Sequence, residues 1–108
     1  MKKLLLTTAI VVTSLVANAQ KLTESDRNTM RLSEQEGYIK CDCSSNTIYV
    51  KPIVWNNLPY QGKENIGAMY AIKCEEIKRN GLYYMNIHDY YSGKKLAKYS
   101  KSWGFKMY

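Results

Sequence analysis

Several residue types and motifs are scarce in this sequence, and each scarcity narrows the class of protein. The 108 residues include one histidine and one phenylalanine. The chain has no nucleophile-elbow motif and no glycine-rich phosphate loop, so the sequence indicates neither a serine hydrolase nor a nucleotide-binding loop. No internal repeat is visible, and the length excludes a multi-domain enzyme, a helical repeat array and a large transmembrane β-barrel. A hydrophobic content of 45% predicts a folded chain rather than wholesale disorder.

Long apolar runs are scarce as well, because only the start of the chain contains one. Two lysines precede an apolar stretch over residues 4–16, and the tripeptide Ala-Asn-Ala follows at 17–19. This order is typical of a bacterial secretory signal peptide with an A-x-A cleavage site. The stretch of roughly 13 residues is shorter than the ~20 that span a bilayer, which favours a cleaved signal peptide over a membrane anchor. We therefore predict that residues 1–19 are removed and that the mature chain, without a transmembrane span, is periplasmic or secreted.

Acidic residues are in the minority over the whole chain. Nine aspartates and glutamates face 16 lysines and arginines, a net charge of +7, and removal of Lys2 and Lys3 with the signal peptide would leave +5. Such a balance favours an anionic partner. Export argues against chromosomal DNA as that partner.

The chain contains only three cysteines, Cys41, Cys43 and Cys74. In an oxidising compartment we expect one disulfide, joining Cys74 to either Cys41 or Cys43, because a bridge within C-x-C would close a very tight ring. Closing a loop of about 30 residues contributes roughly 3 kcal/mol, which matters in a small domain. The remaining thiol is either buried and inert or pairs with another chain in a disulfide-linked dimer. C-x-C is not a usual zinc spacing, so we predict no metal and no cofactor.

Residues 20–36 are polar and form either a disordered arm or a short helix. Thr23 and Asp26 have the spacing of a capping box, and Gly37 suits the end of a helix from about 24 to 36. After this segment, β-branched and aromatic residues recur with period two, which predicts a single antiparallel β domain over residues 37–108. Its turns are expected at 44–46, at Asn80-Gly81 and at 92–93, and a loop is expected over 56–66. Its strands are expected at 38–43, 47–55, 67–77, 82–91 and 94–107. Pro52 would break or end the second of these strands, and the last would be broken near Gly104.

The predicted fold is α+β or mainly β: a five-stranded antiparallel meander, as an open sheet or a small barrel, with a short N-terminal helix as an option. Asn-Gly is a strong hairpin signal, and a hairpin at Asn80-Gly81 would set Cys74 opposite Ile87 and Lys73 opposite His88. Tyr83, Met85 and Ile87 would then face the core.

Tyrosine is abundant where phenylalanine is not. All ten tyrosines follow Gly37, and lysines are interleaved with them near the C-terminus. Aromatic rings with polar tips beside cations suit an anionic or protein partner, although a solvated sheet face has the same composition. The residues that we predict for binding are Tyr84, Tyr90, Lys94, Lys95, Lys98 and Trp103.

An enzymatic alternative comes from the other face of the predicted hairpin. Glu75 and His88 would lie diagonally across two strands, with Arg79 and Lys73 nearby. A carboxylate base, a histidine acid and cations are what metal-free RNA cleavage requires, and small secreted microbial ribonucleases place such groups on an antiparallel sheet. No family motif accompanies the arrangement, and other catalytic schemes have less support.

The sequence thus favours a non-enzymatic function. We expect a small, exported, disulfide-containing binding protein of the bacterial envelope, an inhibitor, immunity protein or accessory factor that binds a protein or an anionic envelope polymer. A secreted ribonuclease using Glu75 and His88 is the alternative, and a purely structural envelope component is a third class.

Overall fold

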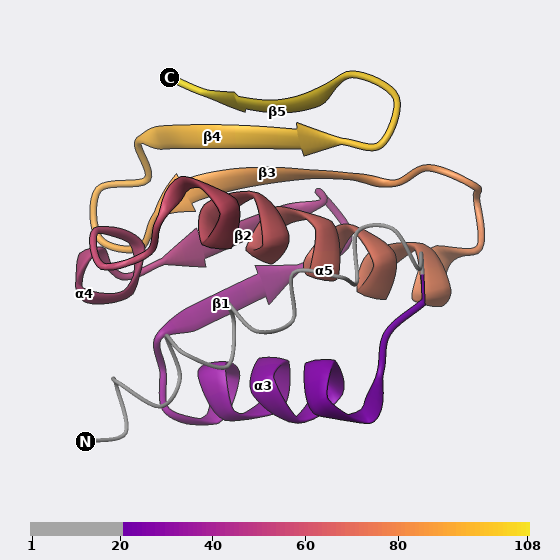
Figure 1. Ribbon diagram of the computed structural model, residues 1–108, viewed down its shortest axis with the longest axis horizontal. Helices are drawn as coiled ribbons and strands as arrows, with labels where there is room; N and C mark the ends of the chain where they lie inside the picture. The colour runs from indigo at the N-terminus through magenta and orange to yellow at the C-terminus, as the bar shows by residue number, and fades with distance from the viewer. Residues whose placement is uncertain (1–20) are drawn as a thin grey trace.

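The computed structural model describes residues 21–108, so the predicted signal peptide lies outside the described residues. The chain forms a sheet with helices packed against it (Figure 1). Its elements, in chain order, are α3 (Glu24–Gln35), β1 (Ile39–Asp42), β2 (Thr47–Val50), α4 (Pro52–Trp55), α5 (Tyr60–Lys78), β3 (Tyr84–Asp89), β4 (Lys95–Ser100) and β5 (Gly104–Met107).

The five strands form one open sheet in the order β1-β2-β3-β4-β5. This confirms the expected α+β class, with a five-stranded sheet and an N-terminal helix. Three neighbouring pairs are antiparallel, but β2 and β3 run parallel. A parallel pair needs a crossover connection, and α4 and α5 supply it. The sheet is therefore mixed, and α5 packs against β3 and β4 (Figure 1).

The strand predicted for residues 67–77 is wrong, because this segment belongs to the 19-residue helix α5. Every residue from Asn65 to Ile72 is buried, so neither helical nor strand periodicity stands out in the sequence. The predicted hairpin at Asn80-Gly81 is wrong for the same reason. Arg79 ends α5 in the left-handed conformation, at φ 51°, and the Asn-Gly pair belongs to a helix-to-strand connection.

The remaining boundaries follow the sequence more closely. β1, the turn after it and β2 form as predicted, and β2 ends at Val50 because Pro52 begins α4. The last predicted strand is the pair β4 and β5, separated at the expected break before Gly104. The predicted loop over 56–66 is shorter, since α5 already begins at Tyr60.

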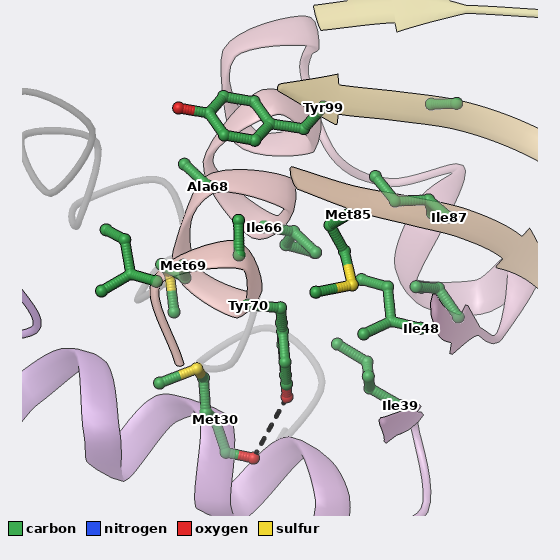
Figure 2. Packing of buried hydrophobic residues seen from close by; sticks show 14 of the residues in the cluster. Met30, Ile39, Ile48, Ile66, Ala68, Met69, Tyr70, Met85, Ile87 and Tyr99 are labelled. Carbon is green, nitrogen blue, oxygen red and sulfur yellow. Dashed lines mark hydrogen bonds between the residues drawn. The ribbon is translucent and has the colours of Figure 1, made fainter. Parts of the chain in front are cut away.

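The hydrophobic core lies between the sheet and the helices, as Figure 2 shows. Met85 and Ile87 of β3 are fully buried, as predicted for this face. Gly67 of α5 lets the helix approach the sheet closely, since a Cβ atom there would lie 2.7 Å from the Cβ of Tyr99. Tyr70 spans the core from α5 to α3 and donates from its hydroxyl to the Met30 carbonyl at 3.5 Å (Figure 2).

Helix α3 begins with the capping box that the sequence predicts. The Asp26 amide donates to the Thr23 hydroxyl at 3.0 Å, and the Thr23 amide donates to the Asp26 carboxylate at 2.9 Å. The helix is fastened to α5 by an ion pair between Lys73 and Glu34 at 2.9 Å. Residues 24–35 therefore form the packed helix rather than a disordered arm.

Candidate functional site

The sheet face opposite α5 carries polar and aromatic side chains. Residues alternate between the two faces along a strand, so Tyr84, Asn86 and His88 of β3 lie on the opposite face from the buried Met85 and Ile87. Strand pairing extends this face across the sheet: Asn86 pairs with Lys98 of β4, which pairs in turn with Lys106 of β5. All three of these residues are half-buried or exposed. Solvent thus reaches a face that is rich in lysine and aromatic rings.

A groove of about 680 Å³ opens at one end of this face. Its walls come from the connection before β3, the first half of β3, the end of β4 and the turn between β4 and β5. None of the residues that line it is acidic. They are Gly81, Leu82, Tyr83, Tyr84, Asn86, Lys98, Ser100, Lys101, Ser102 and Trp103.

Both aromatic rings and lysine side chains line the groove. Trp103 is 90% exposed, so its ring is available to a partner. The Lys101 ammonium lies 5.0 Å from the centre of the Tyr83 ring, a cation–π distance that positions both side chains. Desolvation, the charge of the neighbouring Glu75 carboxylate and a hydrogen bond to it raise the pKa of Tyr83. The groove can stack on a flat ligand and attract negative charge at the same time.

The structure divides the predicted binding residues into two groups. Tyr84, Lys98 and Trp103 meet in the groove. Tyr90, Lys94 and Lys95 lie at the other end of the sheet, around the turn between β3 and β4.

Tyr90 belongs to a separate aromatic cluster at that turn. Its ring contacts the ring of Tyr91 at a centroid distance of 5.4 Å, and the Lys51 ammonium lies 5.0 Å from its centre. The turn itself is ordered by Asp89, whose carboxylate accepts from the amides of Tyr91 and Ser92. These bonds, the amide of Ser92 first, lower the pKa of Asp89. The aromatic rings of this second cluster therefore contact each other and Lys51 within the chain, which gives them a structural role in the turn.

Seven of the ten residues that line the groove are not among those predicted for binding, and these seven include Tyr83, Asn86 and Lys101. Tyr83, predicted to face the core, precedes β3, packs partly buried against the core and also lines the groove. Lys101 lies two residues before Trp103, in the turn between β4 and β5, where the sequence predicts a continuous strand up to the break near Gly104. Asn86 shares a strand face with Tyr84, so alternation along β3 could have identified it.

The catalytic alternative does not assemble. Lys73 and Glu75 lie on α5 and Arg79 caps its end, whereas His88 lies on β3, on the face away from the helix. Lys73 is paired with Glu34, and the Glu75 carboxylate accepts from the Gly81 amide at 3.2 Å. The predicted register between Lys73 and His88 is wrong because the first of the two strands is a helix.

His88 instead has structural neighbours on the sheet. Its Nδ1 lies 3.0 Å from the Gly93 carbonyl oxygen, and its ring contacts Tyr49 edge-on at 5.7 Å. A general acid needs a nearby base and a place for substrate, and the predicted carboxylate is on another element.

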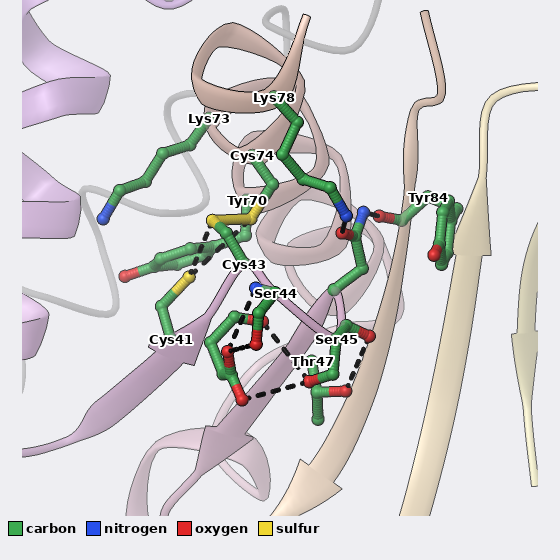
Figure 3. Close-up of a disulfide and its surroundings, with 12 residues drawn as sticks. Cys41, Cys43, Ser44, Ser45, Thr47, Tyr70, Lys73, Cys74, Lys78 and Tyr84 are labelled. Atoms are coloured by element: carbon green, nitrogen blue, oxygen red, sulfur yellow. Dashed lines mark hydrogen bonds between the residues drawn. A yellow bond between two sulfur atoms is a disulfide. The ribbon is translucent and has the colours of Figure 1, made fainter. Parts of the chain in front are cut away.

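The disulfide joins Cys43 and Cys74, 31 residues apart in sequence (Figure 3). Of the two pairings expected from the sequence, the structure selects this one. Cys41 keeps its thiol, half-buried beside the bridge, with its sulfur 3.7 Å from Cys43 Sγ and 3.9 Å from Cys74 Sγ. All three sulfurs lie within 4.8 Å of one another, but the bond between two of them leaves Cys41 as the single thiol of the group.

We expect the Cys41 thiol to react slowly with iodoacetamide. Burial raises its pKa from 9.0 to about 11, against an opposing effect of Lys73. The reactive thiolate is then about a hundredfold scarcer at pH 8 than for an ordinary thiol. Intact-mass measurement between pH 7 and 9.5 should give a rate that rises tenfold per pH unit without levelling off. The oxidised protein in urea is the reference, and a plateau near pH 9 in the folded protein would contradict the prediction.

Comparison with protein-family models, with curated proteins and with solved structures found no match to this chain. None of the helices among residues 21–108 combines the length and the apolar character that crossing a bilayer requires.

Proposed function

We propose that this is a small, exported binding protein of the bacterial envelope, held by one disulfide, that captures an anionic partner in the groove. The partner is a protein or an anionic envelope polymer, and the binding protein acts as an inhibitor, an immunity protein or an accessory factor. The observation that carries this proposal is the groove itself, in which Tyr83, Tyr84, Lys98, Lys101 and Trp103 line one cavity that has no acidic residue in its lining.

Physical chemistry favours binding over catalysis at this site. An exposed tryptophan and tyrosines offer large contact area at low entropic cost, and lysines attract an anionic surface over about 10 Å at moderate salt. The groove contains no histidine and no carboxylate, the side chains used most often as general acids and bases. The lysines and hydroxyls that are present suit recognition.

Export is supported by two independent features. The first 19 residues have the order of a signal peptide, and the described part of the chain has a disulfide. Structural disulfides persist in oxidising compartments and are rare in the cytosol. A periplasmic or secreted destination is therefore part of the proposal.

The test is capture of envelope material by the purified, oxidised protein. Envelope extract and purified sacculi serve as prey at 50 and 300 mM salt, and Lys98→Glu and Trp103→Ala are compared with the unmodified protein. We expect each variant to weaken capture at least tenfold, because one reverses a groove charge and the other removes its most exposed ring. A protein partner should survive the higher salt, whereas a polymer bound by charge alone should be lost.

The matched control is Lys94→Glu, the same charge reversal in the turn at the other end of the sheet. It should change capture by less than twofold if the groove is the binding site. Equal losses for Lys98→Glu and Lys94→Glu would mean that net charge, not the groove, holds the partner. Capture that survives both groove variants would refute the proposal.

A further inference from the structure

Besides the groove, the outer edge of β5 is a part of the sheet where a partner could bind. β5 pairs with β4 on one side, and no strand among residues 21–108 pairs with its other side. The opposite edge of the sheet differs, since α3 lies beside β1 (Figure 1). An unpaired strand edge presents backbone donors and acceptors and is a template for strand addition.

The register identifies which backbone groups point outward. The Tyr108 amide donates to the Leu96 carbonyl at 3.0 Å, and Lys106 pairs with Lys98. Hydrogen-bonded and non-hydrogen-bonded pairs alternate in an antiparallel ladder, so Lys106 bonds to β4 as Tyr108 does. The amides and carbonyls of Phe105 and Met107 therefore point to the free edge.

Exposed apolar side chains lie on β5 and next to its two ends. Trp103, Met107 and Tyr108 are 90%, 41% and 62% exposed. On the helix side, Tyr60 is 57% exposed and packs edge-on against Phe105 at a centroid distance of 5.3 Å. Exposed apolar surface concentrated at an unpaired strand marks an interaction site more strongly than the same residues scattered singly.

Charge and register together restrict what can pair there. Lys106 is the one charged residue of β5, and it lies next to Lys98 on the open face. A strand added at this edge would place one of its side chains beside Lys106, where an aspartate or glutamate is favoured. Its neighbours in sequence would lie on the helix side beside Phe105 and Met107, where apolar side chains are favoured.

The same rule disfavours a second copy of this chain as the occupant. Outward-pointing residues must pair with each other across a new antiparallel ladder. For two copies of β5, the register with the greatest overlap sets Phe105 against Met107 and so places Lys106 directly opposite its own copy. Like charges directly opposite each other destabilise a sheet.

We propose that the β5 edge receives an extended segment of a partner protein, as a sixth strand, in which acidic and apolar residues alternate. This rests on the proposed function and commits its partner to protein rather than polymer. The segment would bond to the Phe105 and Met107 backbone, and its acidic side chains would extend toward Lys106 and the groove.

The probe is the soluble peptide Glu-Val-Glu-Val-Glu-Val-Glu-Val, with Glu-Glu-Glu-Glu-Val-Val-Val-Val as its composition-matched control. NMR of the oxidised protein should show that the alternating peptide slows hydrogen exchange at the Phe105 and Met107 amides at least tenfold. The block peptide should leave their exchange unchanged. Equal effects of the two peptides, or protection of neither amide, would overturn the proposal.

Two variants distinguish specific strand addition from non-specific binding of the peptide. Met107→Pro removes an outward donor without removing a bond to β4, so it should weaken peptide binding at least tenfold, while Met107→Leu should not. Lys106→Glu should reverse the preference in favour of Lys-Val-Lys-Val-Lys-Val-Lys-Val, and this outcome does not depend on how Met107→Pro folds. Failure of the charge reversal would refute the assigned register.

The outcomes separate this inference from the proposed function. Loss of envelope capture in Lys98→Glu, with no peptide binding at β5, would leave the groove function standing and reject the edge. If the peptide binds at β5 but the groove variants do not change envelope capture, the edge inference stands and the groove function is rejected.

Discussion

Replacing Cys43 with serine is expected to leave the oxidised protein with a disulfide, now between Cys41 and Cys74. The Cys41 sulfur already lies 3.9 Å from that of Cys74, so a small side-chain rotation brings the two within bonding distance. The new bridge would span 33 residues instead of 31, and the loop entropy that it removes from the unfolded chain is nearly the same. We therefore expect the free energy of unfolding to fall by no more than about 1 kcal/mol, the scale of an ordinary substitution.

The double variant Cys41→Ser/Cys43→Ser should behave very differently. With no partner left for Cys74, the contribution of roughly 3 kcal/mol from the bridge is lost, a large share of the stability of a small domain. Urea unfolding of both variants measures the difference, and intact mass before and after reduction reports the bridge. Cys41→Ser alone is the control and should keep the native disulfide. A folded, air-oxidised Cys43→Ser protein with two free thiols would contradict the prediction.

Replacing Asn46 with alanine should destabilise the protein by about 2–4 kcal/mol, because a buried polar group with several partners is lost. Asn46 is buried and sits in the β1–β2 turn at φ 50°. Its side-chain amide donates to the Tyr84 carbonyl at 2.9 Å, and its side-chain oxygen accepts from the Lys78 ammonium at 2.8 Å. Figure 3 shows Lys78 and Tyr84 approaching this point from α5 and β3. The Asn46 side chain thus connects the β1–β2 turn to the end of α5 and to the start of β3, which lines the groove.

Two further substitutions separate the causes. Asn46→Gly tolerates the positive φ but lacks both side-chain bonds, so it should recover only the backbone part of the loss. Asn46→Asp keeps an acceptor for Lys78 and loses the donor to Tyr84, so it should lie between alanine and the natural residue. Urea unfolding at neutral pH ranks the three. If alanine and glycine are equal and both cost less than 0.5 kcal/mol, the side-chain bonds do not stabilise the fold.

Local features of the chain could be predicted because their causes are local. Thr23 and Asp26 form the capping box within four residues, and Pro52 ends β2 because it cannot donate to the ladder. Gly104, with φ at 91°, breaks the C-terminal segment into two strands as the sequence indicates. Alternation along β3 correctly assigned Met85 and Ile87 to the core.

The candidate site could be predicted only in part. The sequence predicts Tyr84, Lys98 and Trp103 as binding residues from their chemistry, and the structure brings them into one groove. The sequence predicts Tyr90 and Lys94 on the same grounds, but they lie at the other end of the sheet, because composition does not show which residues the fold brings together.

The sequence by itself determined several local features of this protein: the capping box at Thr23 and Asp26, the β1–β2 turn, the split of the last strand and the presence of one disulfide. Only the tertiary structure decided that residues 60–78 are helical, that β2 and β3 run parallel and that Cys43 rather than Cys41 bonds to Cys74. The physical reason is burial. A segment that is buried on all sides shows no periodicity that separates helix from strand, and once α5 crosses over the sheet, strand order, cysteine geometry and the groove follow from contacts between residues far apart in the chain.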